Sequence, residues 1–274
     1  MNPKAILDHP VISERYFFPR RDRLKDPFLV PVPGGALACH YERNHPDAPT
    51  LIHFHGNGEV VSDWTGDAFV SILDGMGYNV LLAEYRGYGM SAGSPSFGAI
   101  LEDTPRILEA AGTEPSRTVL FGRSVGSIPA IRGVSLCPGI GGLVLESGIA
   151  DLMERLLVRL TPSELGVGEA DLEKSVLSVM DHRASMRAYT GPVLVMHTLH
   201  DHLVDISHGQ RLYDWAGGSR KKLVVFDRGD HNSILFANAR QYFTELGSFL
   251  QTIRASSEAE GPSPSERHAA SDRS

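Results

Sequence analysis

The sequence predicts an α/β fold, with helices on both faces of a doubly wound, mostly parallel sheet and a small helical cap inserted late in the chain. Short apolar runs alternate with segments of helical periodicity over most of the length. Several of these runs are continuously apolar, as expected of parallel strands buried on both faces. In addition, a Gly-x-Ser-x-Gly motif stands between one such run and a helical segment.

The chain divides into three predicted parts: an N-terminal extension over residues 1–35, a main domain over 36–254 with its cap at about 149–189, and a disordered tail over 255–274. The tail is almost devoid of apolar residues that could offset the entropy of ordering. Strands are predicted at 36–41, 50–55, 79–85, 118–121, 142–145, 193–197 and 222–226. Helices are predicted at 64–76, 100–111, 209–216 and 239–253, and in the cap at 151–160 and 169–179.

The composition limits the kinds of partner and compartment. The 274 residues are 42% hydrophobic, enough for one large core, and the net charge of −7 without a basic block argues against nucleic acid. Cys39 and Cys137 form neither a disulfide framework nor a metal quartet, which favours a reduced compartment, and both are interpreted as core residues. No signal peptide and no window near the ~20 apolar residues of a membrane span are found. We therefore expect a cytoplasmic protein; its oligomeric state stays open.

The Gly-x-Ser-x-Gly motif covers Gly122 to Gly126, with Ser124 at its centre. A serine on a sharp strand-to-helix turn takes up strained backbone angles, and glycines two residues away on either side let neighbouring backbones approach. The backbone amide of Val125 would then point to the place where an oxyanion forms. A helix N-cap is the alternative role for Ser124, but the flanking glycines and the buried strand before it argue against that role.

A serine nucleophile needs a base and an acid that orients the base. Asp201 follows the predicted strand at 193–197, and His231 follows the strand at 222–226. The chain order serine, acid, histidine, with each residue on a loop at the carboxyl end of a strand, is the one found in α/β hydrolases. The sequence therefore predicts a triad of Ser124, Asp201 and His231.

Three other carboxylates compete with Asp201 for the acid. Asp205 lies on the same loop, and Glu146 follows the preceding strand. Asp230 adjoins the histidine, whereas the orienting acid is expected on a separate loop. Asp201 is favoured because it directly follows its strand and leaves a turn before the next helix.

The second oxyanion donor is expected on the loop after the strand at 50–55. We assign it to the backbone amide of Asn57, beside that of Val125. His53 and His55 are two residues apart, so they share a strand face and could hold a metal. The turn formed by Asn57 and its flanking glycines is the more natural interpretation, and no metal or cofactor is predicted.

Two further patterns are interpreted as structural. His197, His200 and His202 cluster in the sequence without an acid or cysteine set that would complete a metal site. The glycines within 87–93 approximate a dinucleotide fingerprint, but the spacing is one residue too long and no helix opens at once. A turn packed under the active-site face is the better interpretation of that stretch.

The motifs together resemble the α/β-hydrolase superfamily over about residues 36–250. More narrowly, they resemble the branch that contains the BEM46-like and ABHD13/ABHD17-type serine hydrolases and the serine aminopeptidase S33-like proteins. The segments that carry the resemblance are His55–Gly58, Glu84–Ser91, Gly122–Gly126, His200–Asp201 and Asp230–Asn232. The resemblance implies an esterase, thioesterase or other acyl hydrolase without a cofactor. The chain departs from the pattern at Glu84, where aspartate is usual, at Ser127, where glycine is frequent, and at Pro129, early in the helix after the elbow.

The resulting hypothesis is a serine hydrolase that cleaves an ester or thioester of a small-molecule or acyl substrate. An amidase or peptidase would use the same triad, and a hydrolase fold kept as a non-catalytic binding protein is the alternative from another class. The pocket would be built by the cap, whose Leu, Val and Met content indicates an apolar acyl group.

Overall fold

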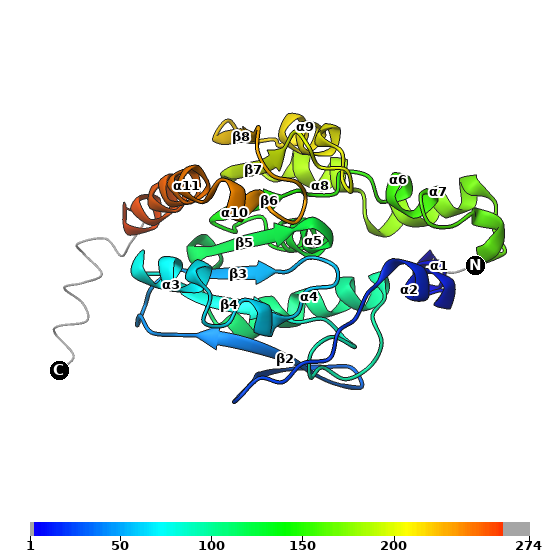
Figure 1. The fold of residues 1–274 in the computed structure, drawn as a ribbon, viewed down its shortest axis with the longest axis horizontal. Coiled ribbons are helices and arrows are strands. Elements are labelled where there is room, and N and C mark those ends of the chain that lie inside the picture. The colour runs from blue at the N-terminus through cyan, green and yellow to red at the C-terminus, as the bar shows by residue number, and fades with distance from the viewer. Residues whose placement is uncertain (1–2, 260–274) are drawn as a thin grey trace.

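The computed structural model describes residues 3–259, and its centre is one eight-stranded sheet (Figure 1). The strands are β1 (Phe28–Val32), β2 (Gly35–Glu42), β3 (Thr50–Phe54), β4 (Asn79–Ala83), β5 (Thr118–Arg123), β6 (Gly142–Glu146), β7 (Val193–Thr198) and β8 (Lys221–Phe226). Their order across the sheet is β1-β2-β4-β3-β5-β6-β7-β8. β2 pairs antiparallel with β1 and with β4, and the other pairs are parallel. This confirms the predicted fold class.

Helices cover both faces of the sheet. They are α1 (Pro3–Leu7), α2 (Pro10–Tyr16), α3 (Ala68–Gly75), α4 (Phe97–Ala111), α5 (Ser127–Leu136), α6 (Leu152–Leu157), α7 (Glu169–Val179), α8 (His182–Ala188), α9 (Ile206–Trp215), α10 (Ile234–Ala237) and α11 (Ala239–Ala259). Short 3-10 helices are η1 (Val61–Asp63), η2 (Pro115–Arg117), η3 (Ser124–Gly126) and η4 (Pro162–Leu165). Within residues 3–259, no helix combines the length and apolar content needed to cross a bilayer.

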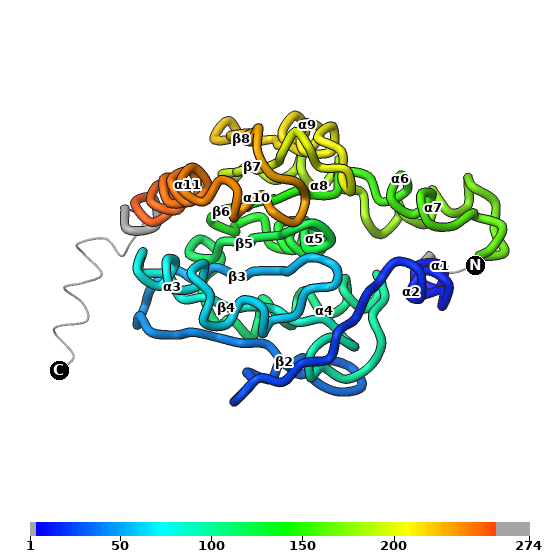
Figure 2. Tube along the Cα trace, viewed as in Figure 1, coloured from blue at the N-terminus to red at the C-terminus, as the bar shows by residue number. Residues whose placement is uncertain are grey.

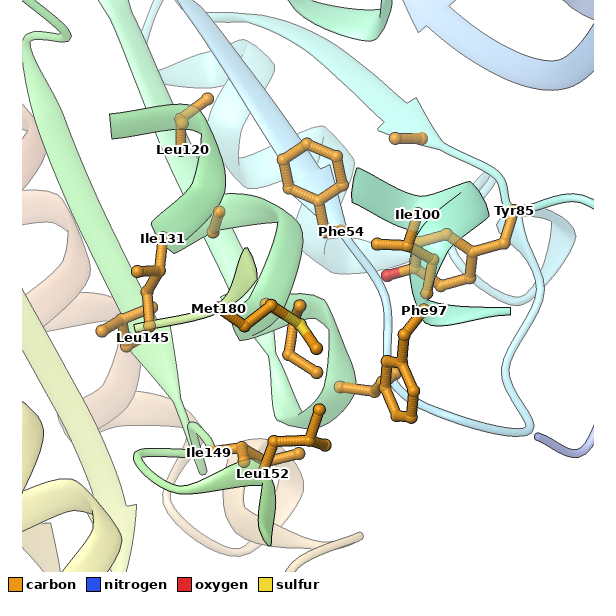
Figure 3. Close-up of a cluster of buried hydrophobic side chains, with 14 of the residues drawn as sticks. Phe54, Tyr85, Phe97, Ile100, Leu120, Ile131, Leu145, Ile149, Leu152 and Met180 are labelled. Atoms are coloured by element: carbon orange, nitrogen blue, oxygen red, sulfur yellow. The ribbon is translucent and has the colours of Figure 1, made fainter. Parts of the chain in front are cut away.

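Two hydrophobic cores lie on opposite faces of the sheet because successive side chains of a strand point to opposite sides. Leu120 of β5 belongs to the core that includes Phe54 and Ile131 (Figure 3), and this core extends under α4, α5 and α9. The next residue, Phe121, belongs to the second core with Phe69 of α3 and the apolar side chains of α11. The continuous apolar runs in the sequence therefore reflect burial on both faces.

The ends of the main domain differ from the prediction. β1, which was not predicted, pairs along its whole length with β2, so the sheet begins at Phe28 rather than at residue 36. At the other end α11 continues to Ala259, beyond residue 255, where the disordered tail was expected to begin. The rest of that tail, 260–274, lies outside the described residues.

The stretch between β6 and β7 holds α6, η4, α7 and α8, and no strand is present in it. α6 and α7 project beyond the carboxyl end of the sheet, where α1 packs against α7 (Figure 1). α8 instead packs on α5 and α9 and contributes Met186 to the first core. The part that stands apart from the sheet is therefore shorter than the predicted cap at about 149–189.

The N-terminal segment runs from α2 back towards β1 (Figure 2) and passes over the loop that follows β3. The amide of Phe18 donates to Asn57 Oδ1 at 3.0 Å, and the amide of Gly89 donates to the Arg20 carbonyl at 2.8 Å. The residues before the sheet are thus attached to the edge at which the parallel strands end.

Candidate active site

The turn after β5 has the geometry predicted for the Gly-x-Ser-x-Gly motif. Ser124 has a φ of 53°, in the left-handed region that non-glycine residues rarely occupy. A Cβ at Gly126 would collide with the carbonyl of Phe54 at the end of β3, and a Cβ at Gly122 would collide with Gly126. Glycine is therefore required at both positions for this turn to pack against β3.

The three residues of the predicted triad meet at the carboxyl edge of the sheet. Ser124 Oγ lies 2.9 Å from His231 Nε2, and His231 Nδ1 lies 2.7 Å from Asp201 Oδ2. All three residues are buried. They come together because β5, β7 and β8 run parallel, so the loops that follow them leave the sheet at the same edge.

Asp201 is held as a carboxylate by several donors. Its Oδ1 accepts from the amides of Leu203 at 2.9 Å and Val204 at 2.7 Å, and its Oδ2 lies 3.4 Å from His197 Nε2. Burial opposes the charge, but the hydrogen bonds with His197 and His231 outweigh it and hold the pKa of Asp201 well below its ordinary value. The side chain of Asp201 is therefore a carboxylate at neutral pH.

The competing carboxylates are engaged elsewhere. Asp205 caps α9 by accepting from the amide of Ser207 at 2.9 Å. Asp230 is exposed and accepts from the amide and hydroxyl of Ser233 within its own turn. Glu146 pairs with an arginine, as described below. None of them contacts His231 in the way Asp201 does.

The loop after β3 places Asn57 beside Ser124. The Asn57 side chain is anchored: its Oδ1 accepts from the Tyr88 hydroxyl at 2.7 Å, and its Nδ2 donates to the carbonyl of Tyr16. Asn57 and Val125 both line the cavity that contains Ser124. Neither of their backbone amides donates to another group within the described part of the chain. Both amides are thus free to meet an oxyanion.

Arg123, next to Ser124, links three loops around the site and was missed by the sequence reasoning. Its buried guanidinium forms ion pairs with Glu59 and with Glu146, the latter at 3.0 Å. Its Nη2 also donates to the carbonyl of His231 at 2.8 Å. Glu59 in turn accepts from the amide of Gly56 at 2.7 Å. The signal that could have identified it is a charged residue at the end of an apolar strand, directly before Ser124.

Glu146 completes this buried cluster. Burial raises the pKa of Glu146, and the charge of Arg123 together with a hydrogen bond from the Tyr242 hydroxyl offsets part of that rise. The cluster connects the Ser124 turn to the ends of β3, β6 and the loop after β8. The cluster therefore positions His231 and the loop after β3.

A second buried pair supports the loop after β3. His55 Nε2 lies 2.7 Å from Glu84 Oε1, and Glu84 Oε2 accepts from the amide of Val61 at 3.0 Å. Burial alone would lower the pKa of His55, but the charge and hydrogen bond of Glu84 outweigh it and raise that pKa. The Tyr85 hydroxyl donates to the carbonyl of His55 at 2.8 Å. Glu84, the departure from the family pattern, thus pairs with the histidine that opens this loop.

The two histidines considered as metal ligands lie in different surroundings. His53 sits among aromatic rings, with Trp64 at 4.4 Å and Phe69 at 5.3 Å between centroids, and burial lowers its pKa well below the ordinary value. His55 follows the last residue of β3 and pairs with Glu84. Across residues 3–259, no group of three or more His, Cys, Asp or Glu side chains is arranged to hold a metal ion.

The cavity at Ser124 has a volume of about 210 Å³. Parts of its wall come from two segments outside the sheet: the cap, which the sequence predicted, and the N-terminal segment, which it did not. The N-terminal segment contributes Tyr16 and Phe18, and the cap contributes Arg155 and Arg159. In the sequence, the Leu, Val and Met content of the cap indicates an apolar pocket. Two of these cap leucines, Leu152 and Leu156, are buried in the first core (Figure 3 labels Leu152 there).

Comparison with curated proteins finds relatives, whereas no family model matches the chain. An uncharacterized protein of Escherichia coli, YfhR, is 31% identical over 189 residues, which are 66% of this chain and 62% of the relative. YfhR of Salmonella typhimurium is 28% identical over 230 residues, 80% of this chain and 77% of the relative. The chain thus spans less than two thirds of the length of the E. coli relative.

Among solved structures, the Pyrococcus furiosus esterase Pf2001 has a TM-score of 0.68 at 19% identity, covering 87% of this chain and 98% of that one. The Paleococcus ferrophilus monoacylglycerol lipase has a TM-score of 0.61 at 18% identity, covering 79% and 99%. A Bacillus anthracis bromoperoxidase has a TM-score of 0.61 at 16% identity, covering 82% and 100%. The chain therefore has the α/β-hydrolase fold.

Proposed function

We propose that this protein is a serine hydrolase that cleaves carboxylic esters or thioesters through an acyl-enzyme on Ser124. One observation carries the proposal: Ser124 Oγ, His231 and Asp201 form a continuous hydrogen-bonded line, with 2.9 Å and 2.7 Å between the joined atoms. This is the order of contacts in which a histidine takes the serine proton and a carboxylate stabilises the resulting imidazolium.

The first half of the reaction acylates the serine. The hydroxyl of Ser124 transfers its proton to His231 Nε2 while Oγ bonds to the substrate carbonyl carbon and the carbonyl oxygen takes the electron pair. Collapse of this intermediate breaks the bond to the alcohol or thiol, which leaves with the proton from His231. Asp201 keeps Nδ1 of the imidazole protonated and stabilises its positive charge throughout.

The second half returns the serine. A water molecule gives a proton to His231 and attacks the acyl carbon. The tetrahedral intermediate then collapses: the bond between the acyl carbon and Ser124 Oγ breaks, the acid is released, and His231 returns the proton to Oγ. In both halves the oxyanion would accept from the backbone amides of Asn57 and Val125, each contributing on the order of 3 kcal/mol. The anchored side chain of Asn57 supports this role because it fixes the loop that carries the amide.

The cavity favours small acyl groups. Its volume of about 210 Å³ lies below the roughly 300–1,000 Å³ typical of sites for drug-sized ligands. We therefore expect the turnover of p-nitrophenyl esters to be fastest with short acyl chains. We also propose that the chain belongs to the BEM46-like and S33-like branch and that it acts in a reduced, cytoplasmic compartment. Only the sequence patterns support these two statements.

The test compares p-nitrophenyl esters from acetate to palmitate on the wild type, Ser124→Ala and the control Ser71→Ala, whose serine is exposed on α3. We expect turnover and labelling by a fluorophosphonate probe in the wild type and in Ser71→Ala, and neither in Ser124→Ala. Turnover that survives in Ser124→Ala would contradict the mechanism. A folded wild type that cleaves p-nitroanilides but no ester would support an amidase, and one that takes neither substrate nor probe would support a binding role.

A further inference from the structure

Two arginines of the cap, Arg155 and Arg159, line the same cavity as Ser124. Arg155 lies in the last turn of α6, and Arg159 follows one turn later, so both side chains leave the same side of this segment. Both are partly buried. Neither has a place in the proposed catalytic steps, which use the backbone amides of Asn57 and Val125.

The neighbouring charges leave these two cations without carboxylate partners. Glu154, between them and α9, pairs with Arg211 at 2.6 Å and with His208 at 3.2 Å. Glu164 pairs with Arg15 at 2.6 Å. Within residues 3–259, neither Arg155 nor Arg159 forms an ion pair with a carboxylate.

The N-terminal segment holds both guanidinium groups at the cavity. The Arg159 guanidinium lies 5.0 Å from the centre of the Phe18 ring, and its Nη1 donates to the Arg15 carbonyl at 3.4 Å. Arg155 interacts with the buried hydroxyl of Tyr16. Burial raises the pKa of Tyr16 to about 12, and the charges of Arg155 and Arg159 limit that rise. These contacts orient the cations but do not neutralise them.

The third arginine on the cavity wall provides an internal comparison. Arg123 is more deeply buried than the other two, and it is matched by Glu59 and Glu146. The chain thus neutralises the arginine that holds its loops and leaves the other two arginines of the cavity wall without a carboxylate partner. An isolated cation in a partly buried site is costly unless an anion meets it, and arginine is well suited to bind carboxylates and phosphates.

We propose that Arg155 and Arg159 form an anion-binding subsite, and that the preferred substrates are small esters or thioesters that carry a carboxylate or phosphate group close to the scissile bond. This inference rests on the proposed hydrolase function for its catalytic consequence. It differs from the sequence-based expectation of an apolar acyl group.

The test uses matched pairs of substrates that differ in one charge. Mono-p-nitrophenyl glutarate and p-nitrophenyl valerate place the charge on the acyl part. 4-Carboxyphenyl valerate and its methyl ester place it on the leaving group. We expect kcat/KM to favour the charged member of at least one pair by about tenfold or more, because charge-assisted hydrogen bonds from arginine are strong. The pair that responds shows on which side of the carbonyl the anion sits.

The variants are Arg155→Gln, Arg159→Gln and the double variant, with Arg106→Gln as the control. Arg106 is exposed on α4 and pairs with Glu109 at 3.3 Å. We expect the charged-to-neutral ratio of kcat/KM to fall about tenfold in the double variant and with added salt, and to stay at the wild-type value in the control. A wild-type ratio at or below one for both pairs would refute the subsite while leaving the hydrolase proposal intact.

A binding measurement separates failure of the subsite from failure of the hydrolase proposal. Equilibrium dialysis of the same four esters against Ser124→Ala reports affinity without turnover. We expect tighter binding of a charged ester than of its neutral match, and loss of the difference when both arginines are also replaced. If the wild type cleaves none of the esters, the hydrolase proposal fails, and equal affinities in this experiment would then overturn the subsite as well.

Discussion

Replacing Arg123 by methionine tests how much the buried guanidinium stabilises the loops around Ser124. Methionine keeps much of the side-chain length but removes the charge and every donor. In the wild type the guanidinium faces Glu59 and Glu146 and donates to the carbonyl of His231. The substitution therefore leaves two carboxylates without their cation, and the side chain of Glu146 is only 2% exposed.

The expected loss of stability follows from these contacts. Removing one partner of a buried ion pair costs about 3–5 kcal/mol. The Glu59 side chain is 22% exposed and can be partly rehydrated, which places this contribution near the lower end of that range. The lost hydrogen bond to the His231 carbonyl adds about 1 kcal/mol. We expect Arg123→Met to lower the free energy of unfolding by about 4 kcal/mol near pH 8.

The loss should depend on pH in a defined direction. Burial already raises the pKa of Glu146, and removing the offsetting charge of Arg123 raises it further. A carboxyl group whose pKa is higher in the folded state contributes stability below its unfolded pKa of about 4.3, and this contribution is lost as the pH rises through the folded value. The difference between variant and wild type should therefore be smaller near pH 5 than near pH 8.

Urea unfolding followed by circular dichroism at both pH values measures these differences. Arg123→Met/Glu146→Gln removes one of the uncompensated charges and should recover a substantial part of the loss at pH 8. The exposed Arg106→Met serves as the control and should stay within about 0.5 kcal/mol of the wild type. An Arg123→Met protein within about 1 kcal/mol of the wild type at both pH values would refute the assignment of a stabilising role to this cluster.

Three further outcomes are expected. Asp201→Asn should lower kcat for p-nitrophenyl acetate by about 10⁴-fold while the fold is retained, because the amide no longer holds the right tautomer of the catalytic histidine; a loss below tenfold would argue for another acid. Glu84→Gln should destabilise the protein most below about pH 6.5, since the raised pKa of His55 contributes stability there that is lost as the pH rises through that raised value; unfolding curves at pH 6 and pH 9 check the sign, and an equal loss at both would contradict it. Gly126→Ala should lower both the free energy of unfolding, by about 1–3 kcal/mol, and the turnover of the same ester, because the added Cβ meets the Phe54 carbonyl; an unchanged protein would show that the turn can relax.

The parallel part of the sheet was predictable because each of its strands is an apolar run of the right length, and this pattern is local. β1 was not, for two reasons that the structure makes clear. It is an edge strand with only Val30 buried, and its apolar run is interrupted by Pro31, which normally argues against a strand. α11 was cut short in the prediction because its last turns carry few apolar residues.

The meeting of Ser124, Asp201 and His231 was predictable for the same reason, since each follows a recognisable strand and parallel strands end at one edge. The roles of Arg123 and Arg155 were not predictable. They depend on which charged side chains lie near each arginine in space, and this is decided by residues far away in the sequence. Periodicity locates elements, but it contains no information on which ions remain unmatched after folding.

The N-terminal segment that crosses the loop after β3 has a consequence for how this protein can diverge. Tyr16 and Phe18 form one part of the cavity wall, and the cap residues Arg155 and Arg159 form an adjoining part; both parts come from outside the sheet. The hydrogen bonds among Ser124, Asp201 and His231 involve neither part. Selection or engineering can therefore exchange residues in both parts and change which molecules the cavity accepts, while these three side chains keep their positions.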